Sequence, residues 1–504
     1  MRLIAGLLLL FLLAGAAAAQ DVLVIAPELW RPALKEWIAD REAAGRKVAV
    51  RAPGGDLHAT VKRIHREGGG ALKFLLLVGD AETIPCGHRR GEVLAAYERD
   101  PEIASDNQLA DLDGDEVPDL AVGRLPADSR EEAAAMLRRS LAYEASRDFG
   151  AWRSRLSVIA GVGGFGALQD KALELVARKF LTENVPAAVR LSVTWASVES
   201  PFCPPPEEFA AETLDRFNEG ALLVAYMGHG HSLALDRLRA GDRTYPIFAA
   251  DRVGGLDARH GAPLAVLIAC STGQFDAARD CLAEEMVRRP AGPIVLVASS
   301  RVSMPYANGV FAKELLDALY AGGAKTAGEW FLAAKRRLVD GAPGDPGREQ
   351  IETLAKMFYQ PDDMLRRKER IEHLFLYNLF GDPTLALALP REASLVCAEE
   401  IARGGRLEIA GSSPVREGEA LLELVAPRGR APAPRRGEAR EEWRRAYREA
   451  NRWEIVSVRV PIVGGTFSGV LTVPHGVEPG SYAVRCFVDG AGGAAQAGRE
   501  VRVR

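Results

Sequence analysis

Two residues whose side chains could act together as a covalent catalyst each follow an apolar run in this sequence. His229 stands between two glycines after the run 221–227, and Cys270 follows the run 263–269. The thiolate is the reactive form of cysteine, and a neighbouring histidine lets it form at neutral pH. The two residues could therefore serve as nucleophile and acid or base, provided that the fold brings them together.

Both apolar runs are predicted to be buried strands of a parallel α/β sheet. Each is bounded by glycine or polar residues and is short, which favours a strand covered on both faces over an amphipathic helix. Side chains at the carboxyl ends of such strands border the crevice where open α/β sheets form their sites. A single Cys or His is more often part of a core, but the occurrence of both at strand ends favours a site.

Length and composition indicate a multidomain globular protein. The chain has 504 residues, of which 48% are apolar, so two or three domains with sizeable cores are expected. The formal net charge is −4 and the pI is about 6.2. This balance gives no electrostatic footprint for nucleic acid or a membrane surface, and we expect a monomer without a nucleic-acid partner.

The first 19 residues are predicted to be a secretory signal peptide. A charged start is followed by a short apolar stretch and a run of alanines that suits cleavage. The alternative is a retained membrane anchor, but the apolar stretch is short for a span. We therefore expect a secreted, periplasmic or cell-surface protein without a retained span. Export permits disulfides among the six cysteines, and Cys397 with Cys486 is the expected pair because both lie in one C-terminal region.

Strands and helices alternate through most of the chain, which predicts a parallel sheet with helices on its faces. We expect an N-terminal α/β subdomain over residues 20–150. A second sheet is expected to begin with the strand 155–160, in a catalytic α/β subdomain over residues 151–390. Further predicted strands of these two parts are 21–26, 47–51, 74–78, 188–193 and 294–300.

An acidic turn follows the third of these strands and could hold a calcium ion. Asp106, Asp111, Asp113 and Asp115 supply the carboxylate oxygens that a hard cation prefers. The fit to an EF-hand loop is imperfect, because Gly114 precedes the last aspartate and no closing glutamate follows. A solvated turn rich in aspartate is the alternative, and both interpretations remain open.

The stretch 161–166 matches the dinucleotide fingerprint G-x-G-x-x-G between a strand and a helix. Two observations count against a nicotinamide cofactor: an exported protein meets little of it, and no acidic residue ends the next strand. We therefore expect Gly163 and Gly164 to belong to a flexible loop that lines the crevice beside His229 and Cys270. No cofactor is expected for the chemistry.

The character of the sequence changes after Pro390. Short alternating segments separated by Gly and Pro turns predict a small β-sandwich over residues 391–504. A charged helical insert, residues 438–452, interrupts it. The simplest interpretation of this run of Arg and Glu is a solvated helix face.

Several of these stretches together resemble the gingipain family of cysteine peptidases, peptidase family C25, which belongs to the caspase-like clan. The resemblance covers roughly residues 21–390, and the sandwich corresponds to the immunoglobulin-like domain that follows the catalytic domain in gingipains. The stretches that carry it, in chain order, are the opening strand and helix, the acidic segment from Asp106 to Pro126, Gly228-His229-Gly230, Ala269-Cys270 with the later Cys281-Leu-Ala-Glu-Glu-Met, and the segment from Leu379 to Leu385.

The resemblance implies a gingipain-like α/β/α catalytic region in two subdomains, followed by an immunoglobulin-like β-sandwich. It implies that Cys270 attacks a peptide carbonyl of a protein or peptide substrate and that His229 protonates the leaving amine. The backbone N–H groups of Gly230 and Cys270 would hold the oxyanion. The alternative is a catalytically silent module of the same fold, used for binding or secretion.

Specificity cannot be carried over directly from the family. Gingipains have an acidic residue where this chain has Val162, so a third catalytic residue is unsupported. In the arginine-cleaving members an acid in the same loop binds the basic side chain, and Asp170 is the nearest candidate here. Arg301 and Met304 could shape a different pocket. Asp170 would favour a basic side chain before the scissile bond, whereas Arg301 would favour an acidic one.

Overall fold

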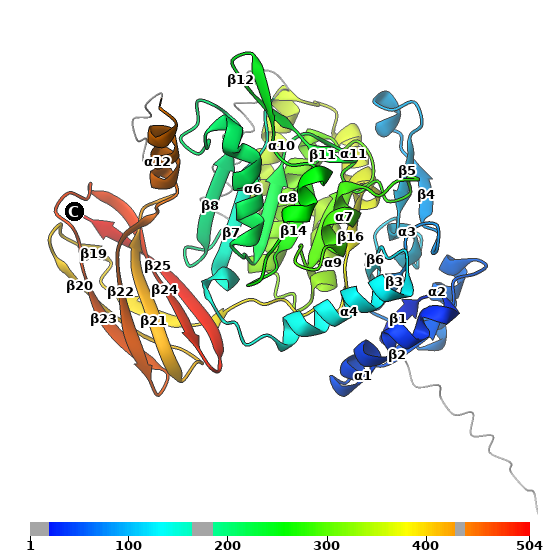
Figure 1. Cartoon of the computed structure of the whole chain (residues 1–504), viewed down its shortest axis with the longest axis horizontal. Helices are drawn as coiled ribbons and strands as arrows, with labels where there is room; N and C mark the ends of the chain where they lie inside the picture. The colour runs from blue at the N-terminus through cyan, green and yellow to red at the C-terminus, as the bar shows by residue number, and fades with distance from the viewer. Residues whose placement is uncertain (1–19, 164–184, 429–438) are drawn as a thin grey trace, which may run out of the picture.

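The computed structural model describes residues 20–163, 185–428 and 439–504 (Figure 1). Its centre is a single sheet of ten strands. In sheet order these are β2 (Val48–Arg51), β1 (Val22–Ile25), β3 (Phe74–Val78), β6 (Ala121–Leu125), β16 (Tyr377–Phe380), β15 (Val295–Ser299), β14 (Leu264–Ile268), β9 (Leu223–Met227), β7 (Arg155–Ala160) and β8 (Arg190–Trp195). The two apolar runs before His229 and Cys270 are therefore neighbouring strands, β9 and β14.

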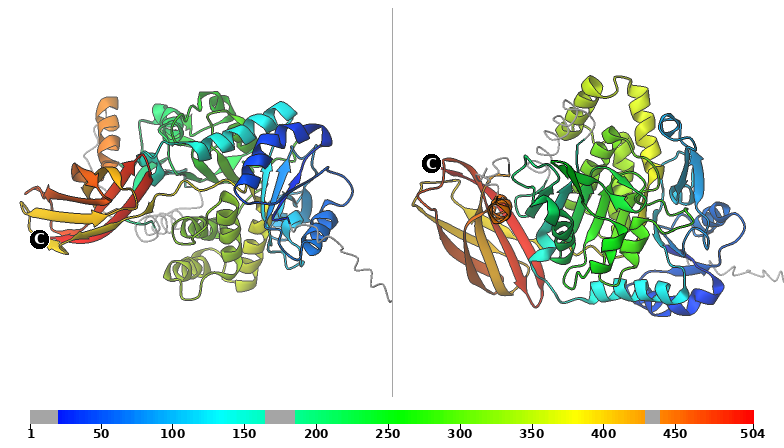
Figure 2. Two further views of the ribbon diagram at one scale, coloured as in Figure 1. Left: turned by 90° about the horizontal axis from the view of Figure 1, so that it is seen from below. Right: turned by 45° about the horizontal axis from the view of Figure 1, so that its top comes forward.

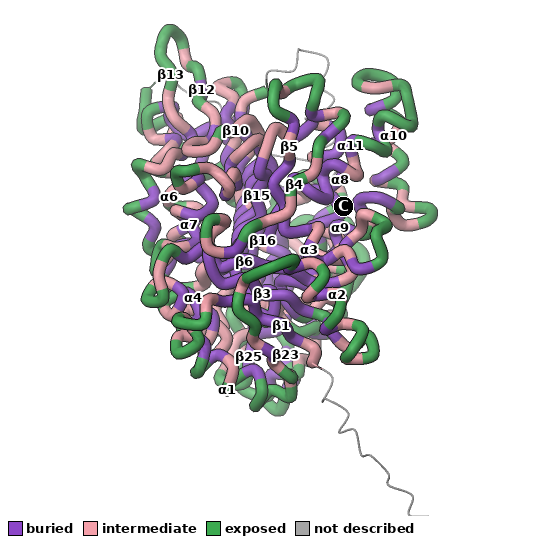
Figure 3. The backbone as a smooth tube through the Cα atoms, turned by 90° about the vertical axis from the view of Figure 1, so that its right-hand side faces the viewer, coloured by how far each residue is buried: buried purple, intermediate pink, exposed green. Residues whose placement is uncertain are grey.

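Helices cover both faces of this sheet, so the predicted α/β/α arrangement is confirmed (Figures 1 and 2). Side chains alternate between the two faces of a strand. Val22 and Val24 of β1 accordingly belong to one core, and Leu23 and Ile25 belong to another. The first core includes residues of α1 (Lys35–Ala43), α4 (Arg130–Ala145), α6 (Phe209–Asn218) and α7 (Leu282–Arg288). The opposite face carries α2 (Leu57–Glu67), α8 (Pro305–Tyr320), α9 (Ala327–Asp340) and α11 (Asp363–Leu376). The strands form the buried centre in Figure 3.

The direction of the strands reverses once within the sheet. β15 and β16 pair antiparallel, whereas all the other neighbouring strands of this sheet pair parallel. β16 lies between the two halves, and the N–H of Gly381, just after it, donates to the carbonyl of Arg124 in β6 (2.7 Å). The expectation of a separate second sheet starting at residue 155 is therefore wrong, because both expected subdomains contribute to one continuous sheet.

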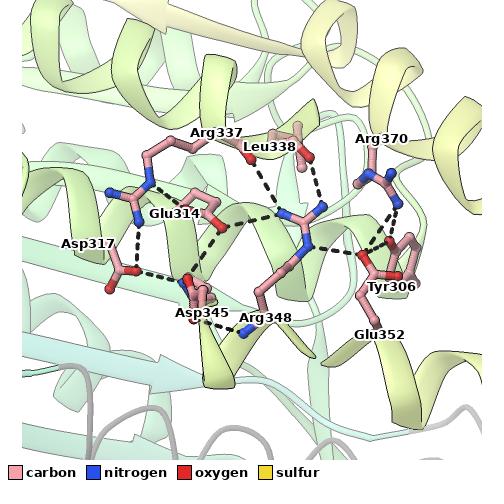
Figure 4. A network of polar contacts seen from close by, with 10 residues as sticks. Tyr306, Glu314, Asp317, Arg337, Leu338, Asp345, Arg348, Glu352 and Arg370 are labelled. Carbon is pink, nitrogen blue, oxygen red and sulfur yellow. Dashed lines mark hydrogen bonds and ion pairs between the residues drawn. The ribbon is translucent and has the colours of Figure 1, made fainter. Parts of the chain in front are cut away.

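A network of buried and half-buried ion pairs fastens α8, α9 and α10 (Pro346–Phe358) to one another (Figure 4). Arg348 of α10 contacts Glu314 of α8 at 3.3 Å and Glu352 at 2.9 Å. Arg337 of α9 also contacts Glu314 at 2.8 Å, and Tyr306 donates to Glu352 at 2.6 Å. Because Glu314 is fully buried, its charge needs these partners. The network fixes the first turns of α8, which follow the loop beside Cys270.

The C-terminal residues form a nearly closed sheet of nine strands, which confirms the predicted immunoglobulin-like sandwich. Its strands are β17 (Arg391–Glu392), β18 (Ser394–Cys397), β19 (Glu400–Ile401), β20 (Arg406–Ser412), β21 (Glu417–Val425), β22 (Glu454–Val463), β23 (Thr466–Thr472), β24 (Gly480–Gly490) and β25 (Gly493–Val503). Cys397 and Cys486 are both free. The expected disulfide is absent between these two described residues, which lie on β18 and β24 in the core of the sandwich.

The charged insert of the sandwich is not a freely solvated helix. It forms α12 (Arg440–Ala450), which leads into Asn451 beside β8, the edge strand of the large sheet. The side chain of Asn451 accepts from the N–H of Val193 (2.7 Å) and donates to its carbonyl (2.9 Å). Trp443 and Tyr447 also contact the catalytic region, through Cys203 O (2.7 Å) and Thr194 Oγ1 (2.8 Å) respectively. The expectation of a solvated face thus overlooked a docked, partly apolar face.

A buried ion cluster makes a second contact between the sandwich and the large sheet. Glu423 of β21 is 1% exposed, and Arg190 of β8 contacts it at 2.5 Å. Arg485 of β24 contacts the same carboxylate at 2.9 Å. Because each partner comes from a different strand, the cluster fixes the sandwich against the edge of the catalytic region.

The predicted signal peptide, residues 1–19, lies outside the described residues. Across the helices of the described ranges, none has both the length and the apolar character needed to cross a membrane.

Candidate active site

The register of two neighbouring strands brings His229 and Cys270 to the same place at the edge of the sheet. β9 and β14 pair in parallel with Met227 opposite Ile268, and each reactive residue follows two positions later. The N–H of Gly228 donates to the carbonyl of Ile268 (3.1 Å), so the ladder continues between them. Paired strands lie roughly 4.8 Å apart. The condition that the fold bring the two strand ends together is therefore met by the backbone register.

Glycines let three backbone segments approach one another closely around His229. A Cβ atom on Gly230 would lie 2.8 Å from Thr272 and 2.9 Å from Ala269, which flanks Cys270. A Cβ on Gly228 would lie 2.8 Å from the Cα of Gly161, the first glycine of the G-x-G-x-x-G stretch. Contacts this short would force the backbone apart. This close approach accounts for the glycine at position 161 without a bound nucleotide.

Tyr226 holds the loop that carries the histidine. Its hydroxyl donates to the carbonyl of His229 (2.7 Å) and accepts from the N–H of Asp236 (3.5 Å). Burial raises the pKa of Tyr226, so the hydroxyl stays protonated and remains a donor. The backbone of His229 is thus fixed by a side chain of the preceding strand.

Cys270 is half-buried, and its sulfur contacts one residue of the loop after β15. The N–H of Ser303 donates to Sγ (3.4 Å), and the hydroxyl of Ser303 lies 3.9 Å from it. The carbonyl of the same residue lies 3.5 Å from Sγ and can accept from the thiol. Ser303 therefore offers donors to a thiolate and an acceptor to a thiol.

The chain turns sharply straight after Cys270. Ser271 has φ +55°, and its N–H donates to the carbonyl of Arg301 (2.9 Å). In the described part of the chain only Ser271 and Glu116 combine a side chain with a positive φ. Such conformations cost about 1–3 kcal/mol and gather at functional sites. Both residues lie in segments where the sequence predicted a site.

The predicted specificity pocket is described only in part. Gly164 and Asp170 lie outside the described residues, and Gly163 is exposed at the boundary. Arg301 forms a bidentate ion pair with Asp276 (2.8 and 2.6 Å). Burial alone would raise the pKa of Asp276, but the hydrogen bonds and charge of Arg301 hold it below its ordinary value. Arg301 is therefore neutralised rather than free to bind an acidic substrate side chain.

The last predicted pocket residue, Met304, is buried, and its N–H donates to Nε2 of His373 on α11 (3.1 Å). The other ring nitrogen of His373 lies 2.7 Å from the carbonyl of Glu369. Burial lowers the pKa of His373 to about 4. The ring is therefore neutral, accepts at Nε2 and donates from Nδ1, so it positions the loop and plays no acid–base role.

The acidic turn divides into two separate groups. Ligand atoms of Asp111, Asp113 and Asp115 lie within 4.8 Å of one another, in an arrangement that could hold a cation. All three carboxylates also accept backbone N–H groups of the same turn. Asp106 is not part of this cluster, because it forms a buried bidentate pair with Arg124 (2.9 and 2.6 Å). The candidate ligand set thus narrows from four aspartates to three.

A cleft of about 660 Å³ lies outside the site formed by Cys270 and His229, and its lining includes neither residue. It adjoins the far end of the loop that starts at Cys270. Its carboxylates are Asp80, Glu82, Asp128, Asp276, Asp280 and Glu284. Burial raises the pKa of Glu284 to about 7, so this group is partly protonated at neutral pH.

Reasoning from sequence missed the residues that support the two reactive side chains. Ser303 contacts the sulfur, Asn308 and Tyr377 contact Ser303, and Tyr226 holds the histidine loop. The only local signal is the polar residue Ser303 shortly after a buried strand. The other three contacts depend on the tertiary fold.

Comparisons with known proteins agree with this geometry. The sequence model of peptidase family C25 matches residues 16–388. Gingipain R2 of Porphyromonas gingivalis is 26% identical over 247 residues, covering 48% of this chain and 30% of that protein. Gingipain R1 of Porphyromonas gingivalis is 26% identical over 247 residues, covering 48% of this chain and 22% of that protein. The chain thus spans less than a third of the length of these two relatives.

A solved structure has the same fold. The crystal structure of gingipain R, an Arg-specific cysteine proteinase, aligns with a TM-score of 0.56 at 18% identity, covering 96% of this chain and 98% of that one. At this identity the likeness shows the fold alone. The family match, by contrast, extends over most of the sequence and includes both reactive residues. The chain therefore belongs to peptidase family C25.

Proposed function

We propose that this chain is an exported cysteine endopeptidase in which Cys270 is the nucleophile and His229 the acid–base residue. The observation that carries the proposal is the strand register, which sets both residues two positions beyond the pair Met227 and Ile268. Membership of family C25 supports the reaction class. The signal-like first 19 residues support export.

The chemistry proceeds in two steps. The Cys270 thiolate bonds to the peptide carbonyl carbon, the C–N bond breaks, and protonated His229 gives its proton to the leaving amine. Water then attacks the thioester while His229 accepts a proton, which releases the carboxylic acid and regenerates the thiolate. The N–H groups of Gly230 and Cys270 are proposed to hold the oxyanion that forms in each step.

Labelling with a thiol-reactive peptidyl probe tests the nucleophile. Cys270→Ala should abolish labelling, whereas Cys281→Ala should retain it. Cys281 is a matched control because it is fully buried, and burial raises its pKa well above the ordinary value. Equal labelling of the two variants would refute the assignment of Cys270.

For the residue before the scissile bond we propose a basic side chain. Arg301 is neutralised by Asp276, and Glu98 accepts from the adjacent Val302 N–H (3.0 Å). Arg301, Asp276 and Glu98 together carry a net charge of −1 beside the loop after β15.

Cleavage of a mixed peptide library tests both activity and preference. Cleavage after Arg or Lys is expected, and it should weaken in Asp170→Ala roughly 30-fold if that carboxylate binds the basic group. Cleavage after Asp or Glu would reject the preference. No cleavage by a chain whose Cys270 still labels would favour a binding role.

We also propose a structural calcium ion at Asp111, Asp113 and Asp115. Three clustered carboxylates in a turn with a left-handed residue, Glu116, support it. Its role would be structural, because the turn is separate from Cys270 in the fold.

A further inference from the structure

A chain of polar side chains leads from β16 to the sulfur of Cys270. The hydroxyl of Tyr377 donates to Oδ1 of Asn308 (2.6 Å), and Nδ2 of Asn308 donates to the hydroxyl oxygen of Ser303 (2.9 Å). Ser303 contacts the sulfur through its N–H (3.4 Å) and its hydroxyl (3.9 Å). Three elements, β16, α8 and the loop after β15, thus converge on the nucleophile.

The hydrogen atoms in the hydrogen-bonded series from Tyr377 to Cys270 can be assigned by elimination. Burial raises the pKa of Tyr377, so its hydroxyl is protonated, and its single hydrogen goes to the short contact with Asn308. This contact orients the amide so that its NH₂ group faces Ser303. The hydroxyl oxygen of Ser303 then accepts, and its own hydrogen is left for Sγ or for the Tyr377 oxygen at 3.4 Å.

The loop that carries Ser303 is anchored on both sides of the contact. The N–H of Met304 donates to His373 (3.1 Å), and the N–H of Ala307 donates to Glu369 (2.9 Å). Ser303 itself is 6% exposed. A fixed donor with little access to water stabilises a charge more strongly than a mobile or solvated one.

We propose that Ser303 stabilises the Cys270 thiolate through its N–H and hydroxyl, and that Asn308 and Tyr377 are positioning residues that orient the hydroxyl for this task. The inference deepens the proposed function and rests on Cys270 as the nucleophile. The carbonyl of Ser303, 3.5 Å from Sγ, can accept from the thiol. Hydrogen bonds to a charged group are stronger than those to a neutral one, so the two donors outweigh this acceptor and favour the thiolate over the thiol.

Few other charges face the sulfur. Tyr226 of β9 and Tyr377 of β16 interact electrostatically with Cys270. The other titratable groups on the adjoining segments are His229 after β9, His231 in β10 (Gly230–His231) and Arg301 after β15. Both tyrosines are neutral because burial raises their pKa. Arg301 is paired with Asp276. Glu98 accepts from the N–H of Val302 (3.0 Å), so the Ser303 contacts act beside the histidines and also near one carboxylate, whose charge opposes the thiolate and makes donors to the sulfur more necessary.

The test measures alkylation of Cys270 by iodoacetamide at pH 6 and at pH 9.5, with the modified peptide quantified by mass spectrometry. Tyr377→Phe should slow alkylation roughly tenfold at pH 6, because less thiolate is present, and change it less than twofold at pH 9.5. Tyr320→Phe is the matched control, since Tyr320 is a tyrosine of α8 whose buried hydroxyl has no partner. It should match the unmodified chain at both pH values.

A double-mutant cycle separates positioning from a general structural effect. Ser303→Ala should show the same selective loss at pH 6, and adding Tyr377→Phe to it should cause no further loss, because both act through one hydroxyl. Additive losses, equal losses at both pH values, or an unchanged rate in Ser303→Ala would each overturn the proposal. Ser303→Ala alone decides the matter if Tyr377→Phe does not fold.

Alkylation needs no peptide substrate, so this test is separate from the proposed function. If the variants lose alkylation rate only at pH 6 and the unmodified chain cleaves no peptide, the peptidase proposal is refuted and the proposed role of Ser303 is supported. Peptide cleavage with an unaltered alkylation profile in Ser303→Ala would do the reverse.

Discussion

Asp382 lies in the loop after β16 and carries no exposed surface, and its two carboxylate oxygens each accept two hydrogen bonds. Oδ2 accepts from Trp37 Nε1 (2.6 Å) and from Arg41 (3.0 Å), both in α1. Oδ1 accepts from the N–H (2.8 Å) and hydroxyl (2.6 Å) of Thr384. We predict that Asp382→Asn destabilises the fold strongly, although it changes the shape of the side chain very little.

The magnitude follows from counting donors and acceptors. An asparagine has one carbonyl oxygen and one NH₂ group. If the NH₂ group faces α1 it meets two obligate donors, Trp37 Nε1 and Arg41; if it faces Thr384 it meets one, the backbone N–H, because the hydroxyl can turn to accept. Arg41 keeps a contact with Glu144 (2.6 Å) but loses its buried counter-charge at position 382. Breaking one partner of a buried ion pair typically costs about 3–5 kcal/mol. We expect a loss of that size in the free energy of unfolding.

Urea unfolding followed by tryptophan fluorescence measures this loss. The matched control is Asp40→Asn, because Asp40 contacts the same guanidinium of Arg41 at 3.0 Å from an exposed position. Exposed pairs contribute about 0–1 kcal/mol, so the control should unfold almost like the unmodified chain. A loss below about 1 kcal/mol in Asp382→Asn, or equal losses in both variants, would refute the reasoning.

Three further predictions concern other parts of the molecule. Burial raises the pKa of Glu284 to about 7 from an ordinary 4.5. The folded state therefore holds a proton that the unfolded chain releases; the resulting stability is full below pH 4.5 and is lost as the pH rises through 7. Glu284→Gln should remove this decline of about 3 kcal/mol in urea unfolding between pH 4.5 and 8, and an unchanged slope would contradict it. Asn451→Ala should lower the free energy of unfolding by about 1–3 kcal/mol, because the N–H and the carbonyl of Val193 in β8 both lose their partner. The exposed Arg448→Ala serves as its control, and equal effects would argue against the contact. Calcium should raise the thermal midpoint relative to chelator, because the ion binds only the folded turn. This response should vanish in a variant carrying both Asp113→Ala and Asp115→Ala. Identical midpoints of the unmodified chain with calcium and with chelator would show that the loop is a turn without a bound ion.

Local sequence determined the strands that carry the reactive residues, and this part of the fold could be predicted. The runs before His229 and Cys270 are apolar, short and bounded by small residues, which are properties of each segment by itself. Their adjacency in the sheet was not predictable in this way, because the segment between them forms two short hairpins and a 3-10 helix rather than the α-helix of a βα unit. The sandwich was predictable for the same reason as the two strands, since alternation and turn residues are local.

Relations between distant segments could not be predicted. β16 is inserted between β6 and β15 from the far end of the catalytic region, and no local pattern reports which strands it joins. The contact of Trp37 with Asp382 spans 345 residues of sequence. All four aspartates of the acidic turn were equally plausible calcium ligands from sequence. In the fold Asp106 instead pairs with Arg124, because a buried guanidinium requires a partner. Charge and spacing alone do not distinguish these environments.

The docking of the sandwich insert against β8 has a consequence for the behaviour of shortened chains. β8 is the last strand of a ten-stranded sheet, and an uncovered strand edge is a template on which other chains can pair and aggregate. Here Asn451 occupies the hydrogen-bonding groups of Val193, and α12 stands beside that edge. A chain ending at residue 390 would keep Cys270 and His229 but lose this cover. The sandwich thus covers an edge of the ten-stranded sheet on which other chains could otherwise pair.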